Sequence, residues 1–520
     1  PCMQKHVCVI ALLAFCVAMA SAMPADVKKV DLTSNTMGCL VCELVTTELF
    51  NWLSENTTAP EVEAYLDKLC LKMPFPGSYG CEWVVKELVK LIPMLVYHIP
   101  KQNIIPLDVC GIIKACDIDC CTSSTPEQVH LSVQSDNSVM YVAWVQSNNW
   151  TQSVVQFGLN GASGPLDMSS PAYVHTYTSG NWKGYIYNAT LTNLKQGAKY
   201  WYRVGSASGG WSKVNSFKTY LNSGYESTTT TWAIIGDMGA NSESDNTVAR
   251  LKELAATDAV GGLLHLGDFY ADGIQRIFDL FGRKVEDISA NIPYQVVPGN
   301  HELAFVTYLG LDGFKNRWFM PYAAPLVEQP GGQEPYWYTF TRGPIRFIGL
   351  NSESHLDVAL VTPVQITWLK QTLALAQQTR AQHPWIVVGF HRPLYCSSTR
   401  ARECETFGGW LRNWLEPIFH DFKVDLVFAG HMHYYERTLP LYQGNVYPGF
   451  NNATAPVYIV NGAGGNREGF SGFVPEAPVW SASRLKEVGY GLLSANMNSL
   501  TWKFYNSETN ELRDTMVLTK

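Results

Sequence analysis

The sequence predicts a multidomain protein in which a small all-α domain with several disulfides is followed by an all-β sandwich and a larger α/β domain. Three observations predict this order: cysteines concentrate near the amino terminus, short β-branched and aromatic runs follow, and apolar strands alternate with helical stretches in the remainder. With 520 residues, 46% hydrophobic and 16% charged, the chain has enough apolar material for more than one core.

The first 22 residues are typical of a secretory signal peptide. Lys5 and His6 precede an apolar run at 7–20, and small residues at 20–22 fit a cleavage site. Ten cysteines remain after this segment, an even number, as an oxidising compartment favours. Four Asn-x-Ser/Thr sequons are present: Asn56, Asn149, Asn188 and Asn452. We therefore expect a secreted or lysosomal glycoprotein.

The predicted all-α domain covers residues 36–121. Apolar residues recur at helical spacing around 40–53 and 84–92. Eight of the ten cysteines lie between Cys39 and Cys121, and spacing alone allows fifteen pairings of the first six. Residues 37–121 contain six lysines, no arginine and eleven acidic residues, so this domain is acidic at neutral pH.

The predicted sandwich covers residues 126–220. Six short runs rich in β-branched and aromatic residues, beginning with VHLSVQ and ending with SFKTY, are separated by Gly, Ser and Asn. No cluster of His, Asp or Cys marks this region as a chemical site, so we interpret it as a structural spacer.

The predicted α/β domain covers residues 230–520, and polar side chains follow six of its strand-like segments. Five of these segments supply the eight candidate site residues: Asp237, Asp268, Tyr270, Asn300, His301, His391, His431 and His433. Polar groups at the carboxyl ends of strands build the binding sites of α/β sheets. We therefore expect these residues to converge.

Such a set of ligands suits two metal ions that bind a phosphate ester and activate water. A tyrosine ionises at acidic pH only beside a strong cation, which favours a ferric ion for Tyr270. The formal charge of −7 argues against nucleic acid as a partner.

The segments GDMG, GDFYADG, GNHE, GFHRP and GHMHYYER, in that order, resemble the five motif blocks of the purple acid phosphatases, within the calcineurin-like metallophosphoesterases. The resemblance covers roughly residues 126–520, including PEQVHLSV and NGAGGNREG. It implies a fibronectin-III-like sandwich, a four-layer α/β/β/α catalytic domain and an acid phosphatase that hydrolyses phosphate monoesters.

The same resemblance implies roles for single residues. Fe(III) would be bound by Asp237, Asp268, Tyr270 and His433. A divalent ion (Zn, Fe or Mn) would be bound by Asp268, Asn300, His391 and His431. His301 would contact the phosphate or protonate the leaving alcohol.

Two departures from the family pattern affect these expectations. Only Phe269 separates Asp268 from Tyr270, where the family has two residues. Either Tyr270 still reaches the iron from a shorter loop, which we expect, or it points away and the site is not purple. The segment after His391 contains Arg392, Arg400 and Arg402, which either bind substrate phosphate or are solvated; for Arg400 and Arg402 we expect solvation. Cys396 and Cys404 are close enough to form a disulfide across this loop.

Six cysteines in the first domain resemble the saposin pattern, which implies the pairs Cys39–Cys116, Cys42–Cys110 and Cys70–Cys81. Cys120 and Cys121 lie outside the pattern. Because saposin-like domains commonly bind lipids, we hypothesise that this domain contacts a membrane in an acidic compartment, where carboxylates lose charge. The alternative is an appendage that aids folding or stability.

Two other functions fit parts of the sequence. An acid sphingomyelinase-like phosphodiesterase with two zinc ions would also join a saposin-like domain to a metallophosphoesterase domain. A lipid-binding protein with a vestigial phosphatase site is the second, although every expected metal-binding position is occupied.

Overall fold

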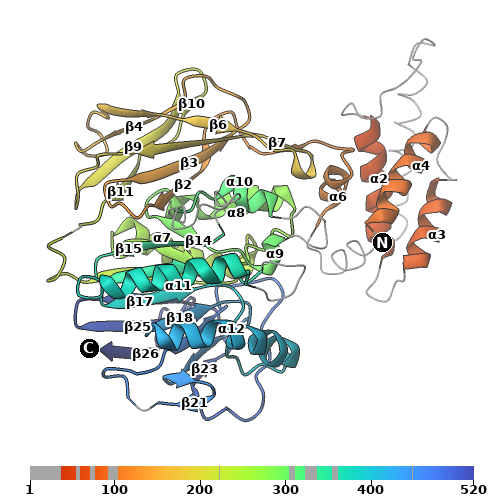
Figure 1. Ribbon diagram of the computed structural model, residues 1–520. Helices are drawn as coiled ribbons and strands as arrows, with labels where there is room; N and C mark the ends of the chain where they lie inside the picture. The colour runs from red at the N-terminus through yellow and green to blue at the C-terminus, as the bar shows by residue number, and fades with distance from the viewer. Residues whose placement is uncertain are drawn as a thin grey trace. The chain divides into compact units, whose positions relative to one another are not determined.

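The computed structural model describes residues 37–53, 59–70, 77–91, 104–221, 223–303, 311–321, 336–353, 361–447 and 449–520 of the chain (Figure 1). The predicted signal peptide and the sequon at Asn56 lie outside these residues. Two compact units form: a helical unit of residues up to Ile118 together with Thr178–Lys183, and a large unit of the remainder. Among the described helices, none has the length and apolar character needed to cross a bilayer.

The described residues of the helical unit form four helices, which pack around an aliphatic core. They are α2 (Met37–Trp52), α3 (Ala59–Cys70), α4 (Gly77–Lys90) and α6 (Pro106–Ile112). Helix α2 packs against the other three. Its Val45 and Leu49 are fully buried, as are Leu66 of α3 and Leu88 of α4. The predicted helical spacing therefore marks the buried faces.

Disulfides fasten α2 to the end of this domain. Cys39 bonds to Cys116 and Cys42 bonds to Cys110, which are the pairs that the saposin pattern implies. Cys81 is also disulfide-bonded. The side chain of its expected partner, Cys70, lies outside the described residues.

A segment of the sandwich also belongs to the helical unit. It contains a 3-10 turn, Ser179–Asn181, and β7 (Trp182–Lys183), which pairs with β1 (Ile118–Asp119). The Asn181 side-chain amide donates to Cys116 O at 2.8 Å and to Asp117 Oδ1 at 2.9 Å. Hydrogen bonds therefore attach this segment to the chain just after the last helix.

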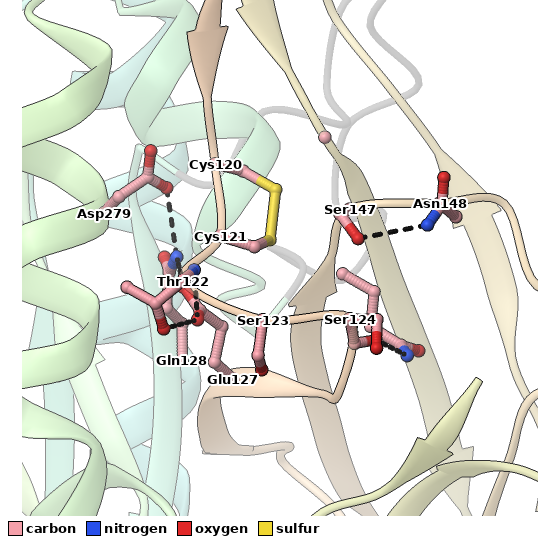
Figure 2. Close-up of a disulfide and its surroundings, with 12 residues drawn as sticks. Cys120, Cys121, Thr122, Ser123, Ser124, Glu127, Gln128, Ser147, Asn148 and Asp279 are labelled. Atoms are coloured by element: carbon pink, nitrogen blue, oxygen red, sulfur yellow. Dashed lines mark hydrogen bonds between the residues drawn. A yellow bond between two sulfur atoms is a disulfide. The ribbon is translucent and has the colours of Figure 1, made fainter.

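Cys120 and Cys121 bond to each other at the start of the large unit (Figure 2). Glu127, a few residues on, accepts hydrogen bonds from Thr122 N at 3.1 Å and from Arg283 Nη1 at 2.6 Å. Gln128 Nε2 donates to Asp279 Oδ1 at 3.0 Å (Figure 2). Since Asp279 and Arg283 belong to α8 (Gln275–Ser289), these contacts fix the first sandwich strand to that helix.

The sandwich consists of two antiparallel sheets, as predicted. One has the order β2–β3–β8–β6: Glu127–Val133, Met140–Gln146, Tyr185–Leu191 and Tyr173–His175. The other has the order β10–β9–β4–β5, with β11 also paired to β9: Gly210–Trp211, Lys199–Ser206, Val154–Gly158, Met168–Pro171 and Asn215–Lys218. Strands β5, β6 and β10 were not predicted, because they are short and none of their residues is fully buried.

Two further sheets form the α/β part of the large unit. The six-stranded sheet has the order β14–β13–β12–β24–β25–β26: Tyr294–Val296, Leu263–His265, Thr230–Ile235, Gly489–Ala495, Ser499–Asn506 and Leu512–Thr519. The seven-stranded sheet has the order β15–β16–β17–β18–β22–β19–β23: Tyr338–Arg342, Ile345–Gly349, Trp385–Gly389, Leu426–Ala429, Val457–Asn461, Tyr435–Thr438 and Ser481–Leu485. A small hairpin joins β20 (Leu441–Tyr442) to β21 (Asn445–Val446).

The two sheets pack face to face between helices, which confirms the predicted four-layer architecture. The ring of Trp232 in β12 lies 4.9 Å from Phe347 in β16, and Phe428 in β18 lies 4.8 Å from Trp502 in β25. Helices α11 (Pro363–Gln378) and α12 (Gly408–Asp421) cover the outer face of the seven-stranded sheet through a shared apolar core (Figure 1). On the six-stranded sheet, α8 packs against α7 (Asp245–Ala256).

Candidate metal centre

The predicted site residues follow strands of both sheets. Asp237, Asp268 and Asn300 come after β12, β13 and β14, which run parallel to one another. His391 follows β17, while His431 and His433 follow the neighbouring parallel strand β18. The carboxyl ends of these strands thus supply the whole set, as expected for an α/β site.

Several of these residues have left-handed backbone conformations. The φ angles are 58° at Asp237, 61° at Asp268, 60° at Tyr270 and 68° at His431. Such angles are unfavourable for residues with a side chain and gather at functional sites. The neighbouring glycines are needed for space, because a Cβ at Gly299 would lie 2.2 Å from Asp268 Oδ1 and one at Gly430 would lie 2.4 Å from Asp237 Oδ2.

One group of ligands surrounds His391. Its Nε2 atom lies 3.2 Å from Asp268 Oδ2, 3.0 Å from Asn300 Oδ1 and 3.2 Å from His431 Nδ1. Within the described residues, Asp268, His391 and His431 offer ligand atoms that all lie within 4.8 Å of one another. These four residues are the set predicted to bind a divalent ion.

A second group surrounds the hydroxyl of Tyr270. That oxygen lies 2.8 Å from His433 Nε2 and 3.4 Å from Asp237 Oδ1, and His433 Nε2 lies 3.5 Å from Asp237 Oδ1. The shortened loop therefore still directs Tyr270 into the site. Phe269 points to the other side, where its ring stacks on Phe281 at 4.6 Å.

Hydrogen bonds leave one nitrogen of each histidine facing its group. His391 Nδ1 donates to Leu266 O and His433 Nδ1 donates to Gly469 O, both at 2.8 Å. Because a carbonyl can only accept, Nδ1 of each histidine carries a hydrogen and Nε2 is the nitrogen that faces the ligand group. In His431 the roles are reversed, since Nε2 lies 2.8 Å from Glu403 Oε2 and Nδ1 faces His391.

The electrostatics of this site suit a bound cation. Burial raises the pKa of Asp237 to about 8, so the carboxylate form is disfavoured without a positive partner. Burial would lower the pKa of His391, but the Asp268 carboxylate raises it to about 10. Burial lowers the pKa of His433 to about 4, and burial with the Arg392 charge lowers that of His431, so both imidazoles are neutral. Neutral imidazoles beside buried carboxylates fit metal ions.

The environment of Tyr270 also suits a bound cation. Burial and the Asp237 carboxylate raise the pKa of its phenol well above the usual value. A strongly charged ion would be required to hold it as a phenolate.

His301 lies beside the two ligand groups. Its main-chain N–H donates to Asp268 Oδ1 at 3.0 Å, its Nδ1 lies 2.5 Å from Asp272 Oδ1, and its ring lies 4.4 Å from that of Tyr270. Burial would lower the pKa of His301, but Asp272 and Asp268 together raise it well above its usual value. His301 is therefore an imidazolium whose Nε2–H is directed away from Asp272.

Further residues, which were not predicted from the sequence, support these candidate ligands. Glu302 accepts hydrogen bonds from the main-chain N–H groups of Asp268, Phe269 and Gly299 at 2.7, 2.7 and 2.9 Å. It thus fixes the loop after β13 to the loop after β14. Its position in the quoted segment GNHE was a signal that could have found it.

Asp272 and Arg467 also support the site. The Arg467 guanidinium is ion-paired with Asp272, donates to Tyr270 O at 2.8 Å and lies over the Tyr270 ring at 5.2 Å. Since Asp272 also holds His301, one carboxylate links His301 to the tyrosine loop. Both residues lie in quoted segments, GDFYADG and NGAGGNREG.

The arginines after His391 have different environments. Arg392 is 2% exposed and its side chain pairs with Glu353 at 2.9 Å and with Glu403 at 2.7 Å. It is therefore neither solvated nor a free phosphate ligand, which corrects both alternatives. Arg400 and Arg402 are exposed, as expected. Cys396 and Cys404 form the expected disulfide around this loop.

Family models match both units. The large unit matches "Purple acid Phosphatase, N-terminal domain" at residues 126–219, "Calcineurin-like phosphoesterase" at 230–435 and "Iron/zinc purple acid phosphatase-like protein C" at 455–515. The helical unit matches "Saposin-like type B, region 1" at residues 37–74.

Individual proteins are also similar. Acid phosphatase type 7 of Mus musculus is 34% identical over 70% of this chain and 84% of its own length. Fe(3+)-Zn(2+) purple acid phosphatase 12 of Arabidopsis thaliana is 31% identical over 71% of this chain and 78% of its own length. The solved structure of purple acid phosphatase PPD1 from yellow lupin (Lupinus luteus) seeds superposes with a TM-score of 0.66 over 76% of this chain and 74% of that chain, at 24% identity.

Proposed function

Because this chain belongs to the purple acid phosphatase family, we propose that it hydrolyses phosphate monoesters at acidic pH with one ferric and one divalent ion. Membership makes it a metal-dependent phosphatase that acts on phosphate esters and has a dinuclear metal centre. The observation that best supports the finer proposal is the position of the Tyr270 hydroxyl, 2.8 Å from His433 Nε2.

The group around the Tyr270 hydroxyl and the group around His391 would each bind one metal ion. Tyr270, Asp237 and His433 would hold the ferric ion, because a phenolate and a carboxylate are hard anionic ligands. Asn300, His391 and His431 would hold Zn, Fe or Mn, with Asp268 shared between the ions. Two such ions supply Lewis-acid chemistry, polarising the phosphate and lowering the pKa of water. An Arabidopsis relative carries Fe(3+)-Zn(2+) in its name.

His301 would protonate the leaving alcohol. Asp272 holds the imidazolium at Nδ1, 2.5 Å away, which leaves the Nε2–H as the group that can donate to an ester oxygen. Glu468 Oε1 lies 3.8 Å from that Nε2. Arg467 keeps Asp272 in place.

We also propose that the enzyme is secreted or lysosomal and that the helical unit brings it to a lipid surface at acidic pH. The exposed sequons at Asn149 and Asn452, the half-buried sequon at Asn188 and the disulfides support a secretory route. Trp52, 38% exposed and stacked on Tyr65 at 4.3 Å, is an aromatic residue suited to a membrane interface. Vesicle sedimentation at pH 4.5 and 7 tests the lipid role, and no binding at either pH would contradict it.

The visible absorption spectrum of the purified protein, with metal analysis of the same sample, tests the metal assignment. We expect iron and a broad band that Tyr270→Phe abolishes, together with faster turnover of p-nitrophenyl phosphate than of its diester analogue. A colourless protein with two zinc ions and a preference for the diester would instead favour the sphingomyelinase-like alternative.

A further inference from the structure

His431 differs from the other histidines of the site in what holds it. His391 and His433 donate to main-chain carbonyls, whereas His431 Nε2 lies 2.8 Å from the side-chain carboxylate of Glu403. Arg392 Nη1 also lies 3.2 Å from this Nε2, but the Glu403 carboxylate is nearer and accepts. Nε2 therefore bears the hydrogen, and the Nδ1 lone pair faces His391 Nε2, 3.2 Å away.

Glu403 is itself held by a buried cation. Arg392 Nη1 lies 2.7 Å from the same Oε2 atom that His431 approaches, and Arg392 Nε lies 2.9 Å from Glu353. The main chain of Arg392 donates to Ser352 Oγ at 3.0 Å. Glu353 and Ser352 thus hold Arg392 in place. The Arg392 guanidinium in turn holds the Glu403 carboxylate beside His431.

The loop that carries Glu403 is closed covalently. Cys404, the next residue, is bonded to Cys396. Within this loop Thr399 N donates to Gly472 O at 2.9 Å and Ser398 forms a bridge with Phe473. The neighbouring Ser471 accepts a hydrogen bond from His433 N at 3.1 Å. The disulfide loop is thus attached to the segment that positions the other metal group.

We propose that Glu403 is a positioning residue for the divalent ion: it orients His431 so that Nδ1 points at that ion. The disulfide-closed loop from Cys396 to Cys404 holds Glu403 beside His431. This inference rests on the proposed function, in which His431 is a ligand of the divalent ion. Hydrogen bonds of this kind to metal-binding histidines are worth about 10–100-fold in metal affinity. Because His433 is held by Gly469 and Ser471 instead, loss of Glu403 leaves the ferric group intact.

Metal binding by the full-length protein tests the proposal. Protein depleted of its divalent ion but retaining iron is titrated with Zn²⁺, and the dissociation constant is compared between wild type, Glu403→Ala and Glu403→Gln. The matched control is Glu405→Ala, which removes an exposed acid on the other side of Cys404. We expect about 10–100-fold weaker zinc binding for Glu403→Ala, a smaller loss for Glu403→Gln, an unchanged visible band in both, and wild-type affinity for Glu405→Ala.

The outcomes separate this inference from the function on which it rests. Equal zinc affinity in Glu403→Ala and Glu405→Ala, with wild-type protein binding zinc tightly, overturns the role of Glu403 alone. Wild-type protein that binds no second ion overturns both. Loss of the visible band in Glu403→Ala along with zinc would mean a general collapse of the site and would also contradict the selective role.

Discussion

The helical unit and the large unit stabilise their folds by different means. Within the part of the chain that the structure describes, the core of the helical unit is aliphatic, and two disulfides tie its first helix to its last segment. The large unit buries the side chains of ionisable residues, among them Asp237, Asp268 and Arg392. A small domain gains little from its core and benefits from covalent restraint. Only the larger core can offset the burial of a site built from charges.

The largest expected effect comes from removing Asp268, the proposed shared metal ligand of the large unit. Asp268→Asn should lower kcat/KM for p-nitrophenyl phosphate by on the order of a thousandfold or more, since the ions stabilise the transition state by several kcal/mol. Steady-state kinetics and metal analysis measure this. If hydrogen exchange in residues 37–53 stays at the wild-type rate, the helical unit is stable independently of the site in the large unit. Faster exchange there would contradict this independence.

Removing a disulfide of the helical unit should have the converse effect. The Cys42–Cys110 bond spans a sequence separation of 68, for which chain entropy predicts about 4 kcal/mol. Cys42→Ser with Cys110→Ser should therefore raise hydrogen exchange throughout α2, measured by mass spectrometry, and leave turnover unchanged. A large loss of kcat would show that the catalytic part depends on this domain.

Acid should weaken the large unit through a buried histidine. His130 of β2 is buried and its pKa is lowered to about 4 by burial, although its Nδ1 donates to Gln128 O at 3.1 Å. Below pH about 6.5 the histidine binds a proton in the unfolded chain, whereas in the folded unit it stays neutral until the pH nears 4. The free energy of unfolding therefore decreases as the pH falls from about 6.5 to 4, by roughly 3 kcal/mol in all.

Urea unfolding at pH 4.5 and 7.0 measures this dependence, with His130→Gln as the comparison. The variant should lose less stability on acidification than wild type, even if it is less stable at pH 7.0. The described residues of the helical unit contain no histidine, so its exchange rates should lack this transition. Identical pH profiles for wild type and variant would rule out His130 as the source.

The smallest effect concerns the sandwich segment that belongs to the helical unit. Asn181→Gly removes the hydrogen bonds to Cys116 and Asp117 while allowing the φ of 53° at this position. We expect a loss of about 1 kcal/mol in the local stability of Thr178–Lys183, measured by hydrogen exchange. Lys183→Ala, which removes a surface ion pair of 3.4 Å to Asp117, should cost less. A larger effect for Lys183→Ala would contradict this.

The sequence allowed the fold and the ligand positions to be predicted because both depend on local patterns. Buried strands such as 426–429 are continuous apolar runs, and the polar residue after each one marks the site. The reach of Tyr270 could only be an expectation, because it depends on Phe269 packing on Phe281 on the opposite side of the loop. Short exposed strands such as β6 lack the apolar alternation that identifies longer ones.

The supporting residues were harder to predict for a different reason. Glu403 contacts His431, 28 residues further along the chain, only because a disulfide and a bridge to Phe473 fold its loop over the site. Nothing in its own neighbourhood distinguishes it from Glu405. Asp272 and Glu302 lie within the motifs, yet no sequence pattern displays their partners: the His301 and Arg467 side chains for Asp272, and three main-chain N–H groups for Glu302.

The bond between Cys120 and Cys121 has a consequence for proteolytic processing. Because these adjacent cysteines close on each other, none of the four described disulfides joins the helical unit to the large unit. A protease that cut the backbone between residues 119 and 126 would leave no covalent link, among the described residues, between the saposin-like helices and the remainder of the chain. Maturation by a single cut could therefore release a free saposin-like fragment in an oxidising compartment, without any reductant.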